Sequence, residues 1–151
     1  MTAVAGATAH RHIRVLIVED NPGDADLIRD ALHESVAHVE ITVVADGAEA
    51  IDYLRRHQDA DAADSQTPDF VLLDLNLPKM NGHEVLTEAR RSAGLKSIPI
   101  IIVTSSDAIR DIVTSYQLGA NCYVTKPGEL AAFQSTMKAV SEFWCRVAKL
   151  P

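Results

Sequence analysis

The sequence predicts an α/β domain in which a parallel β-sheet is covered by helices on both faces. Short apolar runs typical of buried strands alternate with segments of helical periodicity, and this pattern repeats five times within about 135 residues. Right-handed crossovers between parallel strands place the helices on the two faces of one sheet. We therefore expect one domain over residues 13–151, preceded by a flexible arm over residues 1–12.

The first strand is predicted over Ile13–Val18, and it ends at the carboxylates Glu19 and Asp20. Asn21 is a good N-cap for the next helix, and Pro22 suits its first position. Four residues at helical spacing give that helix one buried face: Ile28, Ala31, Leu32 and Ser35.

The second strand is predicted over Val39–Ala45, and residues 46–49 resemble a capping box that opens a helix through Leu54. The polar segment Gln58–Pro68 is expected to be a surface loop. Its aspartates do not form an EF-hand, because that motif requires Gly at the position of Asp64 and Glu at the position of Phe70.

The third strand is the centre of the pattern, because the apolar run that begins at Phe70 stops at a carboxylate, Asp74. Pro78 and the pair Asn81-Gly82 then predict a turn. The following helix is expected over Gly82–Arg91, with Val85, Leu86 and Ala89 facing inward.

The fourth strand is predicted over Ile98–Val103, followed by Thr104 and by two serines that could cap the next helix. That helix ends at Gly119, a good residue to follow a helix C-terminus. It carries four side chains on one face: Ile109, Ile112, Val113 and Tyr116.

The fifth strand is predicted over Asn121–Thr125 and ends at Lys126-Pro127. A last helix, over residues 128–149, follows. Its inward stripe is predicted to consist of Leu130, Phe133, Met137, Val140, Trp144 and Val147. Cys122 and Cys145 are too few and too far apart for a disulfide framework or a zinc site, so we interpret both as packing residues.

The most economical strand order is 2-1-3-4-5, as in flavodoxin-like folds, with five helices in a three-layer sandwich. Strands one and three are then neighbours, which brings Glu19, Asp20 and Asp74 together. Carboxylates this close repel one another unless a cation lies between them, and Mg²⁺ suits a site with few carboxylates and phosphate oxygens. A carboxylate can also attack phosphorus, and Lys126 and Thr104 end neighbouring strands where they could contact the phosphoryl oxygens.

Four motifs at strand ends resemble those of response-regulator receiver domains: V-E-D-N-P (18–22), L-L-D-L-N-L-P (72–78), I-I-V-T-S (101–105) and Y-V-T-K-P (123–127). The resemblance implies that Asp74 is the phosphoacceptor and that Asp20 and Asp74 bind Mg²⁺ directly. It implies that Glu19 acts on the metal through water and the Asn76 carbonyl completes the metal shell. It further implies that Lys126 and Thr104 contact the phosphoryl group, that Tyr123 is a switch residue, and that the Lys126–Pro127 bond is cis.

Within this family, the opening N-P-G-D-A-D and the closing F-W-x-x-V-x-K-L-P resemble small single-domain regulators of phytochrome histidine kinases. The partner implied is a sensor histidine kinase, possibly a bacteriophytochrome, and the output is a protein contact rather than an enzymatic reaction. An alternative is a phosphorelay intermediate or phosphate sink for another kinase.

Two rivals come from other classes. A haloacid-dehalogenase-like phosphatase also uses an aspartate and magnesium, but it has D-x-D after the first strand, where this chain has Glu-Asp-Asn. A flavin carrier would need a Thr/Ser/Gly-rich phosphate loop in residues 19–24, which this segment lacks.

The bulk properties are those of a cytoplasmic domain. The chain has 151 residues, 47% hydrophobic residues and a net charge of −7, which disfavours non-specific binding to nucleic acid. No apolar run has the length of a membrane span or the form of a secretory signal.

A homodimer is expected through the last helix. A second stripe lies beside the inward one and contains small uncharged residues and one aromatic: Ala132, Thr136, Ala139 and Phe143. The alternative to a dimer contact is that Phe143 packs on the edge of its own domain.

Overall fold

The computed structural model describes residues 12–151, so the predicted arm lies outside the described residues apart from His12. A five-stranded parallel sheet has the order β2-β1-β3-β4-β5, which confirms the predicted topology. The strands are β1 (Ile13–Val18), β2 (Val39–Val44), β3 (Phe70–Leu73), β4 (Ile100–Thr104) and β5 (Cys122–Thr125).

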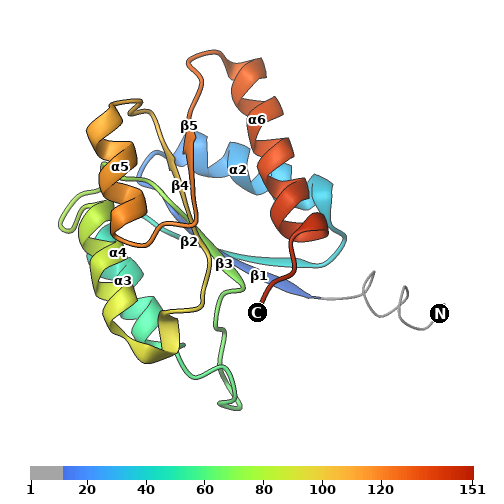
Figure 1. Ribbon diagram of the computed structural model, residues 1–151. Coiled ribbons are helices and arrows are strands. Elements are labelled where there is room, and N and C mark those ends of the chain that lie inside the picture. Colours follow the sequence, from blue (N-terminus) through green and yellow to red (C-terminus); the bar gives the residue numbers. More distant parts are fainter. Residues whose placement is uncertain (1–11) are drawn as a thin grey trace.

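Two layers of helices enclose the sheet (Figure 1). Helices α2 (Pro22–Ser35) and α6 (Leu130–Glu142) cover one face, while α3 (Gly47–Arg56), α4 (Gly82–Arg91) and α5 (Ile109–Gln117) cover the other. Two short turns complete the chain: η1 (Ala93–Leu95) after α4, and the π-helical turn η2 (Phe143–Val147) after α6. No helix in residues 12–151 is long and apolar enough to cross a membrane.

The sheet has apolar side chains on both faces, and they are most completely buried in its central strands. Alternate residues of β1 point to opposite layers, so Leu16 and Val18 pack on the α3 and α4 side while Val15 and Ile17 pack on the α2 and α6 side. Strands β3 and β4 are buried along their whole length. A parallel strand buried on both sides reads as a continuous apolar run, which is why these strands were predictable.

Three helices begin at a residue whose side chain caps them, while α5 and α6 have no side-chain cap. The side chains of Asn21, Asp46 and Asn81 accept hydrogen bonds from the first turns of α2, α3 and α4. Among the described contacts, only Asn81 and Glu84 form a complete capping box, so Asp46 supplies one half of the box predicted for α3. Neither serine caps α5: its N-cap is Ala108, because the Ser106 hydroxyl instead donates to the Asp111 carboxylate at 2.6 Å.

Two predicted apolar faces lie at the surface. On α5, Ile109, Val113 and Tyr116 are exposed, and the buried residue is Ser115, whose hydroxyl bonds to His83 on α4 at 2.9 Å. At the ends of the last helix, Leu130 and Val147 are exposed instead of facing inward. The π-helical turn after Glu142 changes the helical phase, and Val147 leaves the inward stripe there.

The middle of that stripe is buried as expected. Phe133 and Met137 lie in the core between α6 and the sheet, and the Trp144 ring packs against Phe70 with ring centroids 6.2 Å apart. Both cysteines are free thiols that pack against the same core. Burial raises the pKa of the Cys145 thiol to about 11, so this thiol stays neutral and fits the packing role predicted for it.

Candidate functional site

An acidic cluster lies at the carboxyl end of the sheet, where β1 and β3 stop side by side. Glu19 and Asp20 follow β1, and Asp74 follows β3; carboxylate oxygens of these three residues all lie within 4.8 Å of one another. The backbone N–H of Asp74 donates to the Val18 carbonyl at 3.0 Å, which fixes the two strand ends together. The strand order therefore brings these predicted site residues together.

The three acids differ in exposure. Glu19 and Asp74 are buried, while Asp20 is exposed, so the cluster opens to solvent on one side. Burial raises the pKa of the Glu19 carboxyl to about 7; the hydrogen bond from Lys126 opposes the rise, and the charge of Asp74 adds to it. A metal cation, in addition to the Lys126 ammonium, would relieve the repulsion between the Glu19 and Asp74 carboxylates.

Lys126 reaches into the cluster from the end of β5. Its ammonium lies 2.5 Å from Glu19 Oε1 and 3.2 Å from Asp74 Oδ2, and its side chain is only 9% exposed. Burial by itself lowers the pKa of Lys126, but the hydrogen bonds to carboxylates outweigh that effect and raise it. The residue is therefore a fixed positive charge beside Asp74.

The Lys126–Pro127 peptide bond is trans, since residues 12–151 contain no cis peptide bond, and the expectation of a cis bond is wrong. The trans isomer is the intrinsically favoured one by about 0.5–1 kcal/mol. Here the Lys126 N–H donates to the Thr104 carbonyl at 2.7 Å, and the ammonium reaches the acids without the cis isomer.

The turn after β3 brings backbone close to the Asp74 carboxylate. The Asn76 N–H donates to Asp74 Oδ1 at 3.3 Å, and Gly82 N donates to the Leu75 carbonyl at 2.9 Å. A Cβ on Gly82 would lie 2.3 Å from the Asp74 carbonyl oxygen, so only glycine fits where α4 begins. This close approach shapes the turn that carries the Asn76 carbonyl.

Thr104 and Tyr123 lie on the neighbouring strands β4 and β5. Thr104 is fully buried at the end of β4, and its hydroxyl has no hydrogen-bond partner in the described part of the chain. A buried hydroxyl without a partner is costly, so a functional explanation is warranted. The Tyr123 hydroxyl donates to the Ser106 carbonyl at 2.8 Å, in the loop that follows β4.

Sequence reasoning missed one residue of this site. Asp24 lies in the first turn of α2, and its Oδ2 is 2.9 Å from the Lys126 ammonium. An acid at that position is usually a helix-capping residue. Here the Asn21 side chain accepts the hydrogen bond from the Asp24 N–H, and the Asp24 carboxylate contacts Lys126 instead. No sequence signal distinguishes the two roles.

The chemistry of the donor set fits a hard divalent cation. Oxygen ligands from three carboxylates on a partly open rim are the kind that Mg²⁺ and Mn²⁺ take. The Thr104 hydroxyl, which has no hydrogen-bond partner in the described residues, and the Lys126 ammonium offer a donor and a positive charge of the kind that stabilise anionic oxygens.

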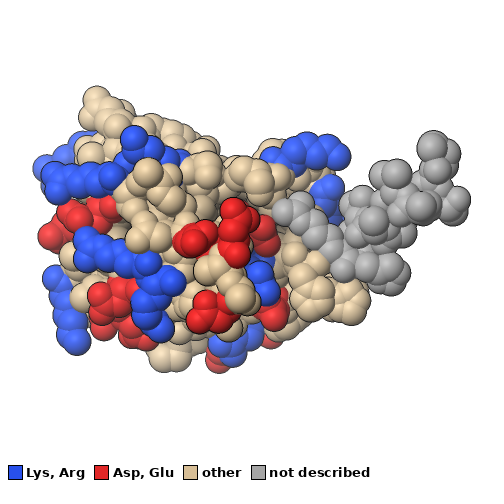
Figure 2. Space-filling model, turned by 90° about the horizontal axis from the view of Figure 1, so that it is seen from below, with Lys and Arg blue, Asp and Glu red and all other residues tan. Residues whose placement is uncertain are grey.

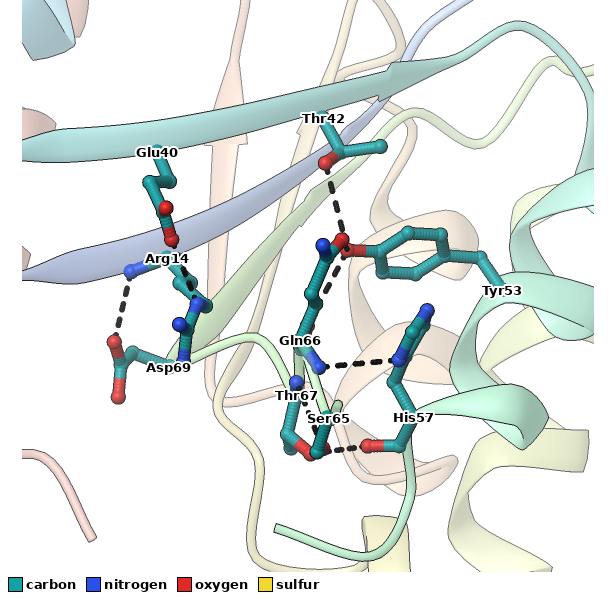
Figure 3. Close-up of polar contacts among 9 residues, drawn as sticks. All are labelled: Arg14, Glu40, Thr42, Tyr53, His57, Ser65, Gln66, Thr67 and Asp69. Carbon is teal, nitrogen blue, oxygen red and sulfur yellow. Dashed lines mark hydrogen bonds and ion pairs between the residues drawn. The ribbon is translucent and has the colours of Figure 1, made fainter. Parts of the chain in front are cut away.

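A separate polar hollow lies beside the residues that begin β1 and precede β3, and Figure 3 draws polar contacts around it. It has a volume of about 290 Å³, and Arg14, Glu40, Thr42, Tyr53 and Gln66 are among its lining residues. The Gln66 N–H donates to His57 Nδ1 at 3.1 Å, and the Tyr53 hydroxyl donates to the Gln66 carbonyl at 3.3 Å. These contacts hold the predicted loop, residues 58–68, against α3.

Charged side chains show no single-sign field on the face drawn in Figure 2, where Lys and Arg are interspersed with Asp and Glu. A protein that binds the nucleic-acid backbone presents a concentrated basic face.

The model of the response regulator receiver domain matches residues 15–138. Response regulator Rcp1 of Synechocystis sp. is 36% identical over 137 residues, which cover 91% of this chain and 92% of Rcp1. The phosphorylated cyanobacterial phytochrome response regulator RcpA has a similar structure, with a TM-score of 0.85 and 42% identity over 93% of this chain and 99% of that one. The Mn²⁺-bound form of Rcp1 gives a TM-score of 0.84 and 35% identity over 92% of this chain and 99% of that one.

Proposed function

The chain belongs to the response-regulator receiver family, and from that premise we propose that it accepts a phosphoryl group from a sensor histidine kinase on Asp74. Receiver-domain response regulators are signalling proteins, and the proposed domain spans residues 13–151. One observation carries the assignment of Asp74: among the three clustered acids, it alone follows the central strand, and its buried carboxylate lies beside both the other acids and the Lys126 ammonium.

The transfer follows from the position of these groups. A lone pair on an Asp74 carboxylate oxygen forms the new P–O bond, and the P–N bond of the phosphohistidine breaks with its electron pair returning to the imidazole nitrogen. The Lys126 ammonium balances charge on the phosphoryl oxygens, and the Thr104 hydroxyl donates a hydrogen bond to one of them.

The proposed cofactor is Mg²⁺, held by the Asp20 and Asp74 carboxylates and the Asn76 carbonyl, with Glu19 acting through water. When bound, it supplies positive charge that neutralises the acids and the phosphoryl oxygens. The acid cluster of this chain and the Mn²⁺-bound form of Rcp1 support the proposal of a divalent metal.

The signal that we propose is a population shift at the surface of α5, β5 and α6. Thr104 moves toward the phosphoryl group, and Tyr123 turns inward into the space that this movement opens. Thr104 is the last residue of β4, and Tyr123 lies on the neighbouring strand β5. When it turns inward, the Tyr123 hydroxyl would break its hydrogen bond to the Ser106 carbonyl. The exposed apolar residues of α5 then face a protein partner.

A phytochrome-type histidine kinase is the proposed partner, because the similarity to RcpA and Rcp1 covers nine-tenths of the chain. We also propose a homodimer through α6. The exposed Phe143, which follows the last residue of α6 and begins η2, supports an intermolecular contact at this end of the helix.

The experiment that tests the assignment compares wild type with Asp74→Asn. Both are incubated with Mg²⁺ and acetyl phosphate or the phosphorylated kinase, and phosphoryl incorporation is followed by intact-protein mass spectrometry. Wild type is expected to gain one phosphoryl group and the variant none. Undiminished labelling of Asp74→Asn would refute the assignment, and turnover of phosphate monoesters would favour a phosphatase instead.

A further inference from the structure

Lys126 is shared among three carboxylates, and one of them lies outside the group of acids that can share a metal ion. The ammonium contacts Glu19 Oε1 at 2.5 Å, Asp24 Oδ2 at 2.9 Å and Asp74 Oδ2 at 3.2 Å. Asp24 is thus a closer partner than Asp74 is. Because Asp24 is anchored on α2, it pulls the ammonium toward that helix.

We propose that Asp24 is a positioning residue that restrains the Lys126 ammonium and so limits how readily it reaches a phosphoryl group on Asp74. This inference rests on the proposed function of Asp74. It assigns to Asp24 a role that neither the strand ends nor the acid cluster reveals.

The charges explain the direction of the effect. Phosphorylation replaces the single negative charge of the Asp74 carboxylate with a phosphoryl group that carries about 1.5 to 2 negative charges at neutral pH. Lys126 then has to contact the phosphoryl oxygens, while Asp24 competes for the same ammonium and repels those oxygens. Asp24 competes effectively with the phosphoryl oxygens because the Lys126 side chain is only 9% exposed, so water screens its ion pairs little. The Asp24 side chain is 31% exposed. Neutralising Asp24 therefore favours the phosphorylated form.

The Asp24 side chain takes no part in the N-cap of α2. Its backbone N–H donates to the Asn21 side chain, so the cap of α2 uses only the main chain of Asp24. Replacing the carboxylate with the isosteric amide leaves that cap in place. Asp26, two residues further along, offers a matched control, because it is an exposed acid whose only described ion pair is a 3.8 Å contact with Arg29.

The test uses the full chain and four proteins: wild type, Asp24→Asn, Asp24→Glu and Asp26→Asn. At saturating Mg²⁺, two quantities are measured: the rate of labelling by acetyl phosphate, and the beryllofluoride concentration that gives half saturation. Asp24→Asn is expected to label about 3- to 10-fold faster and to need correspondingly less beryllofluoride, a change of up to about 1.4 kcal/mol. Asp26→Asn should match wild type, and Asp24→Glu should restore a rate near that of wild type.

The outcomes separate the two claims. Equal behaviour of Asp24→Asn and Asp26→Asn, or slower labelling of Asp24→Asn, overturns the role of Asp24 while leaving Asp74 as acceptor. An equal acceleration in Asp24→Glu also overturns it, since the carboxylate would then be irrelevant. If wild type itself takes no phosphoryl group and binds no beryllofluoride, the proposed function fails, and the inference fails with it.

Discussion

The Arg90 guanidinium of α4 donates two hydrogen bonds to the carbonyl oxygen of Gly119, 3.0 Å from Nε and 2.9 Å from Nη2. Gly119 has φ = 104°, and a Cβ there would press on the Arg90 side chain at 3.0 Å. The same guanidinium satisfies further acceptors in the segments that lead into β4 and β5: Leu95 O, Lys96 O, Ile98 O and Asn121 Oδ1. One side chain thus fixes the segments that lead into β4, which ends at Thr104, and β5, which Lys126 follows.

Replacing Arg90 with Met is therefore expected to lower the free energy of unfolding by at least about 3 kcal/mol, because several acceptors lose their donor at once. The matched control is Arg91→Met on the exposed face of α4, where the side chain is 73% exposed and pairs with Glu88. That change should cost less than about 0.5 kcal/mol. Urea unfolding measures both, and equal midpoints for the two variants would contradict the role of Arg90.

The fold was predictable because its central strands, β3 and β4, are buried on both sides, which leaves a nearly unbroken run of apolar residues in each. Strand β1 begins and ends where the pattern placed it, at Ile13 and Val18. The carboxyl-end acids were predictable for a related reason: Glu19 and Asp20 directly follow the apolar end of β1, and Asp74 is the first charge after β3. The role of Arg90 could not be predicted, because its partners are mostly backbone carbonyl oxygens. The amino-acid sequence does not indicate where those oxygens lie in the fold.

The amphipathic pattern of a helix also does not state what covers its apolar face. Ile109, Val113 and Tyr116 recur at helical spacing as core residues do, yet the sheet is already covered beside them and they face outward. Ser115 takes the buried position because the His83 ring and the Asp111 carbonyl satisfy its hydroxyl, at 2.9 and 2.7 Å. Such pairings depend on the packing of two helices and cannot be predicted from one of them.

Asp20→Asn and Lys126→Ala are expected to affect different steps. Losing Asp20 removes a proposed metal ligand, so Mg²⁺ affinity should fall about 10-fold or more. Losing Lys126 removes an ammonium that contacts the same acids, 2.5 Å from Glu19 Oε1. Mg²⁺ should therefore bind at least as tightly as in wild type, while labelling by acetyl phosphate weakens. Isothermal titration with Mg²⁺ measures the first quantity. Equal loss of metal binding in both variants would rule out this division.

The two buried hydroxyls without described partners, those of Thr104 and Ser141, give a matched pair of substitutions. Thr104→Val and Ser141→Ala each remove an unsatisfied polar atom, so neither should destabilise the domain by more than about 1 kcal/mol, and either could stabilise it. Only Thr104→Val should weaken the response to phosphorylation, because Ser141 lies on α6, outside the proposed site.

The response of these two variants is measured by hydrogen exchange of β4, β5 and α5, with and without beryllofluoride and Mg²⁺. Wild type and Ser141→Ala should change alike, and Thr104→Val should change little. A full response in Thr104→Val would remove the Thr104 hydroxyl from the switch.

The last prediction concerns assembly through α6. Phe143 is 49% exposed and meets the Trp144 ring edge-on, with centroids 5.3 Å apart, so half of it is left for a partner beyond its own domain. A charge placed in a hydrophobic interface is costly to desolvate, so Phe143→Glu should shift the protein to monomer, whereas Glu142→Gln beside it should not. Sedimentation of wild type and both variants at several concentrations, with and without beryllofluoride, measures this. A wild type that stays monomeric throughout, or a Phe143→Glu variant that dimerises as well as wild type, would exclude α6 from the assembly.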